Sequence, residues 1–491
     1  MKLNHLSTAA VVALFAAGCA HIPSVGPNYH KPETKAPTQW DGPFAGGETN
    51  APVEMAWWKN FHDAELNSLV ERAAGSNLDL RMAQARVREA RAQYSGAFAD
   101  LWPTVDGAAG YSRLRAPEHA PVLGTLHLPP GSSYEDDLHV GGFDASWEID
   151  VFGGKRRAVE AAKAQFSGAE FGQRDVLVTL LGEVARNYVE LRGYQKRLAI
   201  ANQNIEAQEK SLAITQNRFT NGVATDLDVQ QATTVLSSTR AVVPTLESLI
   251  ETTTHRLEVL LGQQPGTLHS ELAEAAPIPA QPPQVPVGLP SDLLLRRPDV
   301  SRAERQLAAA TANIGVAKSD LFPKFYLTGL AGLESVSADD WFTSGSRFWS
   351  VGPTVQWRIF DAGRIRANIK VHTARQQQAL ASYEQTVLTA FEEVEDNLVL
   401  YAKEQTRRRS LEAAVNASQK TLDTANRLYA SGLTDFIHVL DAERSLYQAQ
   451  DSLAQSDRTI AANLIALYKS LGGGWETMTQ SNALASAQAV K

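Results

Sequence analysis

The chain has 491 residues, of which 44% are apolar and 20% are charged, a composition typical of folded proteins. Its formal net charge of -8, with no basic domain to offset it, argues against nucleic acid as a partner. Past residue 20 no window approaches the roughly 18 apolar residues that a membrane-spanning helix needs, so insertion into a membrane would require strands that close into a barrel.

The N-terminus has the features of an export signal. Lys2 is followed by a short apolar run from Leu6 to Ala17, which ends in small residues directly before Cys19. Cys19 is the only cysteine in the chain, which excludes an internal disulfide. A lone cysteine at this place resembles the lipobox of bacterial lipoproteins, so we expect residues 1–18 to be a signal peptide and Cys19 to carry lipid. The alternative is a cysteine without a role in a discarded signal.

An internal duplication organises the rest of the sequence. Asp79 and Asp299 open matching stretches at a spacing of 220 residues, and the two halves end alike at Leu261-Gly262 and Leu471-Gly472. Each half therefore predicts the same order of elements: a helix, a β-hairpin, a very long helix, a turn and a helix. The matched segments between these points are Asp100–Pro103 with Asp320–Pro323, Trp147 with Trp357, Gly154–Ala158 with Gly363–Ala367, and Arg218–Asp226 with Arg427–Asp435.

Apolar residues recur every seven positions along both predicted long helices, the first of which extends from about Lys155 to Thr220. A strict seven-residue period predicts helices that supercoil around their neighbours, whereas an ordinary helical core is the alternative. A helix of about 65 residues is roughly 100 Å long. The helix ending near Asp100 and the helix over 226–261 together match this length, which predicts that two short helices stack end to end. Pro244 lies within one of them and is expected to kink it.

Two segments alternate between apolar and polar residues, as membrane strands do. They are Phe143–Val151 and Trp349–Ile359, and weaker glycine-rich strands at 105–113 and 325–334 complete two hairpins. A half-buried sheet of a soluble protein would alternate in the same way. Four strands leave two unpaired edges, so subunits must combine: two chains give eight strands and three give twelve, and the long helices favour three.

Short motifs of recognisable type are spread over nearly the whole chain. They are Val25–Tyr29, Trp57–Asp63, Leu295–Val300, Trp357–Gly363, Leu440–Leu446 and Leu471–Trp475. Together they resemble the motifs of TolC-like outer-membrane factors, specifically the lipoprotein subfamily (NodT family) of RND efflux systems. The resemblance implies an α+β membrane protein whose homotrimer joins a twelve-strand outer-membrane β-barrel to a twelve-helix periplasmic α-barrel.

The resemblance also implies a function. The trimer would be the passive exit duct of a tripartite pump, anchored by lipid in the outer membrane and docked to a periplasmic adaptor (membrane fusion) protein and an inner-membrane RND-type transporter. It would conduct drugs or other small molecules.

The sequence also predicts the boundaries of the segments. They are a lipid-anchored segment 19–62, a first repeat 63–276 with its hairpin at about 104–151, a proline-rich linker 277–290 inside an irregular stretch 277–298, a second repeat 291–472 with its hairpin at about 325–360, and a tail 473–491.

The family's periplasmic constriction maps onto the start of the last helix. Matching its motif, Ile437 would form an apolar ring and Asp441 an acidic ring of three carboxylates, with Arg444 placed to pair with Asp441 three residues away. Tyr429 matches a position that ties the closed state together in relatives. The helix turns around Gly222 and Gly432 would be the periplasmic tips, where glycine accepts a positive φ. Alternatively, Asp441 and Arg444 form a routine solvated pair.

No motif of an enzyme is present, and we expect no catalytic residue, cofactor or structural metal. His119, His127 and His139 lie in or beside a predicted external loop, where a weak metal site is conceivable. Two other functions remain open: the exit duct of a type I secretion or heavy-metal efflux system, and a non-conducting structural lipoprotein that spans the envelope.

Overall fold

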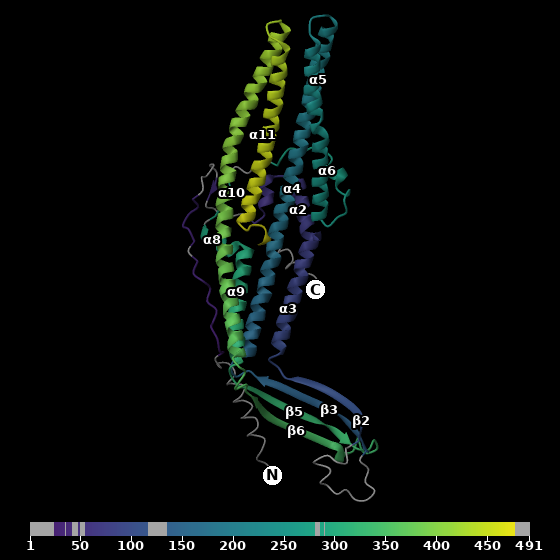
Figure 1. Cartoon of the computed structure of the whole chain (residues 1–491), viewed down its shortest axis with the longest axis vertical. Helices are drawn as coiled ribbons and strands as arrows, with labels where there is room; N and C mark the ends of the chain where they lie inside the picture. Colours follow the sequence, from purple (N-terminus) through teal and green to yellow (C-terminus); the bar gives the residue numbers. More distant parts are fainter. Residues whose placement is uncertain are drawn as a thin grey trace. The chain divides into compact units, whose positions relative to one another are not determined.

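The computed structural model describes residues 24–34, 36–41, 48–49, 55–115, 135–279, 285–288 and 290–476. Cys19, the predicted signal peptide, His119 and His127 lie outside these residues. The chain forms two compact units, and the long helices begin in one unit and continue into the other (Figure 1). The first unit comprises Met1–Pro32, Arg88–Ser167 and Glu304–Ala381, and the second comprises Glu33–Val87, Gly168–Ala303 and Ser382–Lys491.

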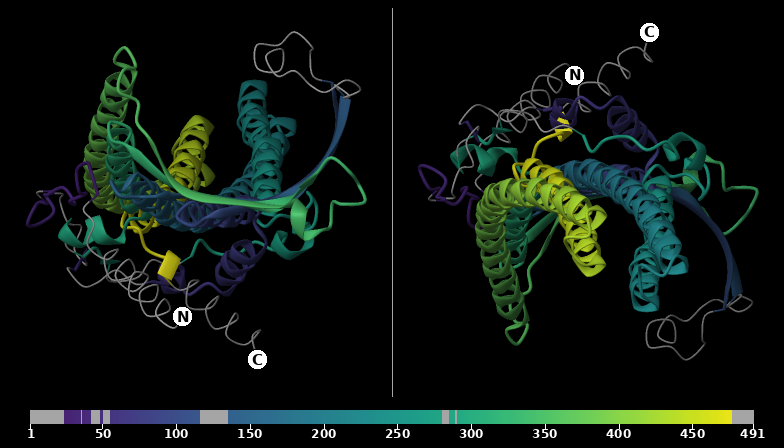
Figure 2. Two further views of the ribbon diagram at one scale, coloured as in Figure 1. Left: turned by 90° about the horizontal axis from the view of Figure 1, so that it is seen from below. Right: turned by 90° about the horizontal axis from the view of Figure 1, so that it is seen from above.

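The first unit contains a four-stranded antiparallel sheet in the order β2-β3-β5-β6. Its strands are β2 (Thr104–Arg115), β3 (Glu135–Ile149), β5 (Lys324–Ser335) and β6 (Arg347–Gln356). The two halves of the chain meet in the middle of this sheet, because β3 pairs with β5. Figure 2 shows the sheet as one curved layer.

Two strands end earlier than the sequence predicts. Val151, Trp357 and Ile359 were expected within strands, but β3 ends at Ile149 and β6 ends at Gln356. The cause lies in their partner β5, which begins at Lys324 directly after Pro323. Proline has no N–H to donate, so the ladder ends there and residues 357–360 have no strand beside them.

The two long helices are confirmed. α4 (Gly154–Thr220) and α10 (Arg364–Ala430) contain 67 residues each. Among the described residues, no helix is both long and apolar enough to cross a membrane. The shorter elements are η2 (Trp57–Phe61), α2 (Ala64–Ser76), α3 (Leu78–Ala99), α5 (Asp226–Arg240), α6 (Val242–Leu260), α7 (His269–Leu272), α9 (Pro298–Ser319), η3 (Ser344–Ser346), α11 (Phe436–Ser470), and the parallel pair β1 (Glu48–Thr49) and β4 (Val285–Pro286).

Proline shapes the helices as expected in one place and not in another. The helix with Pro244 is interrupted at Ala241, between α5 and α6, because the proline ring clashes with the carbonyl four residues earlier. The stretch 277–298 was expected to be irregular throughout, and this is wrong. It contains the short helix α8 (Pro290–Arg296), where proline occupies the first turn and needs no hydrogen-bond partner.

The core of the second unit surrounds a cluster of aromatic residues. Trp57 stacks on Tyr468 of α11 with ring centroids 5.4 Å apart, and it meets Trp58 edge to face at 5.8 Å. Asp63 follows this segment and caps α2, where its Oδ1 accepts from the amide of Leu66 at 2.9 Å. The hydroxyl of Tyr188 on α4 also donates to Asp63, so the cap fixes α2 against the long helix.

Candidate functional site

Both helix tips end in the same hydrogen-bonded turn. At the end of α4 the amide of Gly222 donates to the carbonyl of Phe219 at 2.9 Å, and the amide of Val223 donates to that of Arg218 at 2.8 Å. At the end of α10 Gly432 and Leu433 repeat both bonds, to Tyr429 and Leu428. This pair of bonds defines a Schellman cap, which needs a residue with positive φ. Gly222 and Gly432 each have a φ of 72°, which confirms the conformation predicted for them.

The predicted gate residues occupy the exposed face at the start of α11. Ile437 is 38% exposed, and Asp441 lies one helical turn further along. The guanidinium of Arg444 donates to Asp441 Oδ1 at 2.9 Å, which confirms the pairing three residues apart. Both partners are more than half exposed, so this pair contributes little to stability and leaves the carboxylate accessible to other cations.

A groove runs between α10 and the start of α11, with a volume of about 810 Å³. Hydroxyl-bearing residues such as Ser418 and Thr421 line one wall, and His438 and Asp441 line the other. All these residues belong to the second unit. The groove therefore places the predicted acidic gate residue, and the histidine one turn before it, on one surface of α11 that faces α10.

Tyr429 joins three helices at the tip. Its ring lies 5.2 Å from that of Phe436, the first residue of α11. The guanidinium of Arg218 from α4 lies over the Tyr429 ring, 4.3 Å from its centroid. The Nη1 atom of Arg218 also donates to the Tyr429 carbonyl at 3.5 Å. A cation over an aromatic face is attracted to it. The sequence showed Arg218 only as a repeated position and gave no sign of this contact.

Asn77 joins the end of α6 to the start of α3. Its side-chain amide donates to the carbonyl of Leu260 at 2.8 Å, and its Oδ1 accepts from the amide of Leu80 at 2.9 Å. Asn77 is only 3% exposed. The residue therefore caps two helices at once and confirms that the short helices stack end to end.

Arg297 occupies the matching place in the second half of the chain. It donates to the carbonyl of Ser470, the last residue of α11, at 3.1 Å, and to Glu393 of α10 at 2.6 Å. It also pairs with both oxygens of Asp299, at 3.0 and 2.6 Å. Burial opposes the ionisation of Asp299, but the hydrogen bond and charge of Arg297 outweigh it and hold the pKa of Asp299 below its ordinary value.

The described residues contain no cluster of three or more histidine, cysteine, aspartate or glutamate side chains that could hold a metal ion. His139, the one described member of the predicted weak metal site, instead packs against aromatic rings. Its ring centroid lies 5.0 Å from that of Tyr111 and 5.9 Å from that of Trp341.

The duplicated long helices, the antiparallel sheet shared by both halves and the capped tips define an outer-membrane channel subunit, and the chain belongs to the outer membrane efflux protein family. The family model matches residues 69–263 and 289–473. The chain is an outer-membrane component of an efflux system, where it serves as the exit duct.

Individual relatives match over nearly their full length. The probable outer membrane lipoprotein SilC of Salmonella typhimurium is 33% identical over 479 residues, which is 96% of this chain and 99% of the relative. The toluene efflux pump outer membrane protein TtgC of Pseudomonas putida is 33% identical over 492 residues, or 99% of each. Among solved structures, the outer-membrane channel OprN is 38% identical, with a TM-score of 0.86, over 92% of this chain and 99% of that one.

Proposed function

We propose that three copies of this chain form a gated, passive exit duct of a tripartite efflux pump. The duct would catalyse no reaction and would conduct drugs or other small molecules delivered by a periplasmic adaptor and an inner-membrane RND-type transporter. Lipid on Cys19 would anchor it, which the likeness to SilC, a probable outer membrane lipoprotein, supports. The segment boundaries expected from the sequence, with repeats over 63–276 and 291–472, belong to the same proposal.

The unpaired edges of the sheet support the proposal that several copies of the chain assemble. Within the described residues, β2 and β6 each pair on one side only, which leaves a row of backbone N–H and C=O groups on each outer edge. Such edges cannot face lipid without partners. Copies joined edge to edge, β6 of one to β2 of the next, satisfy both rows, and three copies give a closed sheet of twelve strands, wide enough for water.

The surface of the sheet supports contact with lipid. Large apolar side chains on its strands are more than half exposed in the isolated chain. Exposed apolar patches are rare outside binding or membrane surfaces, so these side chains indicate such a surface. They include Val105 (66%), Phe143 (66%), Trp349 (77%), Val351 (65%) and Val355 (57%).

The start of α11 supports the proposal of a gate. Three copies would bring three Asp441 carboxylates together, and like charges repel unless cations lie between them. The ring contact of Tyr429 with Phe436 would hold this end of α11 on α10, and Arg218 over Tyr429 would join α10 to α4. Closing the duct therefore depends on a few contacts at the tip, which a docking partner could replace.

Conductance of the purified protein in planar bilayers tests the proposal. The wild-type protein should pass a small current, and Asp441→Ala should raise it because the constriction loses its charged ring. Asp423→Ala provides a matched control, since Asp423 is an exposed acid on α10 whose carboxylate accepts a hydrogen bond from Gln419 one turn away. The absence of current from both the wild-type protein and D441A, or a monomeric mass in detergent, would rule out a trimeric duct.

A further inference from the structure

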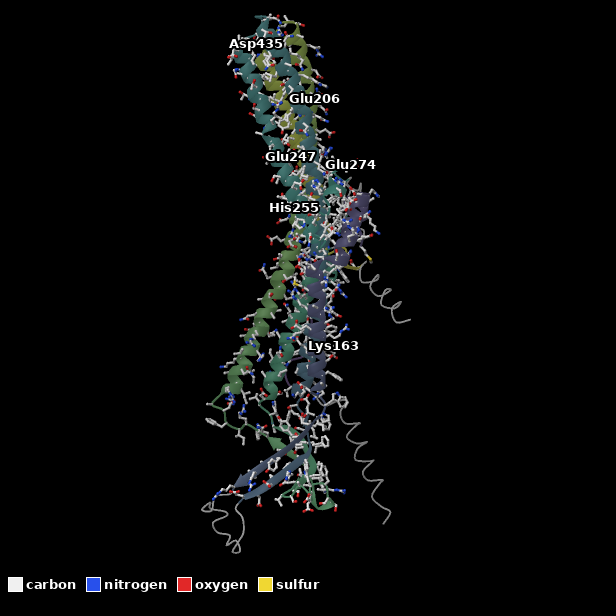
Figure 3. The ribbon with its side chains drawn as sticks, turned by 90° about the vertical axis from the view of Figure 1, so that its right-hand side faces the viewer. Lys163, Glu206, Glu247, His255, Glu274 and Asp435 are labelled. Carbon is white, nitrogen blue, oxygen red and sulfur yellow. The ribbon has the colours of Figure 1, made fainter. Side chains whose placement is uncertain are left out.

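A buried polar contact joins α4 to α11, directly behind the predicted gate residues. Glu443 on α11, which is 5% exposed, meets Ser211 on α4, and the buried Gln208, which is 3% exposed, lies one turn before Ser211 on the same helix. Glu443 follows Asp441 by two positions, so it points away from the exposed face that carries Asp441. Figure 3 labels Glu206, in the same turn of α4 as Gln208, and Asp435 at the tip.

Only half of the carboxylate is satisfied. The hydroxyl of Ser211 donates to Glu443 Oε1 at 2.5 Å. Within the described residues, Glu443 Oε2 has no hydrogen-bond partner, and neither Oε1 nor Nε2 of Gln208 has one. Ser211 follows Gln208 by three positions, which places both on one face of α4. Three polar atoms of this interface are therefore buried without a protein partner.

The surroundings of this contact are apolar. Leu440, Val439 and Ala442 of α11 form a cluster with Ala232 of α5 and Ala425 of α10, and Leu212 of α4 packs against it. An unsatisfied buried polar group costs about 1–3 kcal/mol, and a charged one costs more. The surroundings therefore disfavour the ionised form of Glu443, whereas a protonated carboxyl needs no counter-charge.

The charged residues on the packed helices are engaged elsewhere or lie on outer faces. Burial raises the pKa of Glu443 above its ordinary value, and only the hydrogen bond from Ser211 opposes it. The charged groups near this level are the pair Glu206–Lys210 on α4, the pair Glu209–Arg240 between α4 and α5, the exposed Lys420, Asp423 and Arg427 on α10, and the pair Asp441–Arg444 and the exposed His438 on α11.

We propose that Glu443 is the proton-binding residue of a latch that holds α11 against α4. The inference rests on the proposed gate and adds a regulator to it. Protonated Glu443 keeps α11 packed on α4, with Ile437 and Asp441 in the closed position. Ionised Glu443 draws water into the contact, where it also solvates the unpartnered amide of Gln208, and α11 moves away from α4.

The sign of the pH dependence follows from the direction of the pKa change. The closed packing raises the pKa of Glu443. The protonated carboxyl therefore stabilises the closed packing fully below the ordinary carboxyl pKa, and this stabilisation is lost as pH rises through the raised pKa. The duct therefore closes in acid and opens toward neutral and alkaline pH. The ratio of open to closed copies changes on the order of tenfold for each pKa unit between the two states.

The test measures single-channel current across a pH series that begins at the ordinary carboxyl pKa, about pH 4, and extends to about pH 8. The wild-type current should rise with pH. Glu443→Gln keeps the shape and the acceptor for Ser211 but cannot ionise, so its current should stay low at every pH. Glu206→Gln is the matched control: it removes an exposed carboxylate from the same region of α4, and its pH series should follow the wild type.

A second variant separates the latch from a loss of folding. Gln208→Met removes the unpartnered amide at similar volume, so it should favour the closed packing and shift the rise in current to higher pH. A pH series of E443Q that coincides with the wild type overturns the latch, as does a wild-type current that does not vary with pH. If D441A still raises the current in that case, the duct stands and only the latch is wrong. The absence of current in every variant overturns the duct itself.

Discussion

The two helix junctions of the second unit perform one task with different chemistry. Asn77 uses a neutral amide, whose donor and acceptor satisfy a carbonyl of α6 and an amide of α3. Arg297 can only donate, so it bonds the carbonyl of Ser470 while Asp299 accepts from the amide of Val300 in its place. The duplicated geometry thus requires a donor and an acceptor at each junction. One residue provides both in the first half, and an ion pair provides them in the second.

The two tips also differ, in how the helix after each turn is capped. Thr225 begins α5 with a complete capping box, in which its hydroxyl accepts from the amide of Asp228 and Asp228 accepts from the amide of Thr225. Asp435 begins α11 without any side-chain cap bond. The helix that carries the predicted gate is therefore held less firmly at its start than its counterpart, although both follow the same glycine turn.

Removing Arg297 should produce the largest effect. Arg297→Ala leaves the partly buried Asp299 and the half-exposed Glu393 without their cation, and loss of one partner of a buried ion pair costs about 3–5 kcal/mol. Thermal unfolding in detergent, followed by circular dichroism, measures this loss. Arg186→Ala is the control, because its exposed pair with Glu190 should contribute about 0.5 kcal/mol at most.

The same junction should respond to acid. The lowered pKa of Asp299 means that its contribution to stability is present above about pH 4, the ordinary carboxyl value, and is lost as pH falls through the lowered pKa. This acid loss should be smaller in R297A, where only the amide of Val300 and the charge of Arg302 still favour the ionised carboxylate. Equal acid sensitivity in the two proteins would show that the ion pair does not stabilise the junction.

Removing Asn77 should have a smaller effect. Asn77→Ala leaves the carbonyl of Leu260 and the amide of Leu80 unpaired, at a cost of about 1–3 kcal/mol without any dependence on pH. Asn416→Ala is the matched control, since Asn416 is exposed on α10 and alanine favours a helix. A loss as large as that of R297A would contradict the contrast between a neutral and an ionic junction.

The tips should give the smallest effect. Thr225→Ala removes the hydroxyl that accepts from the amide of Asp228 and donates to its carboxylate, and should cost about 1 kcal/mol. Asp435→Ala removes no side-chain cap bond and should stay within about 0.5 kcal/mol of the wild type. Amide hydrogen exchange at the first turns of α5 and α11 reports both changes locally. Equal protection of these turns in the wild-type protein would remove the proposed difference between the tips.

Much of this fold follows from the sequence because its signals are periodic or local. The seven-residue repeat predicts the long helices, Pro244 predicts the break after Arg240, and the glycines at the tips predict positive φ. The strand ends were predicted wrongly because the alternation of apolar and polar residues continues past Gln356. The actual end of β6 depends on where its partner strand β5 begins.

The contacts that complete the site could not be predicted in this way. Arg218 meets Tyr429 across 211 positions, and Ser211 meets Glu443 across 232. A period shows which face of a helix is apolar, but it does not show which helix packs there. The exposed pair of Asp441 and Arg444 was predictable because both residues lie on one helix turn.

The unbroken length of α11 has a mechanical consequence. Its 35 residues span about 52 Å, whereas its counterpart is divided into α5 and α6 at Ala241. A helix with a proline break can bend there and absorb a displacement of its tip. A continuous helix behaves as a rod, so a twist applied near Ile437 reaches the far end at Ser470, where Arg297 acts as the pivot. Torque on the predicted gate would thus be borne by the ion pair of Arg297 with Asp299, whereas α5 and α6 have a break at Ala241 where they can bend.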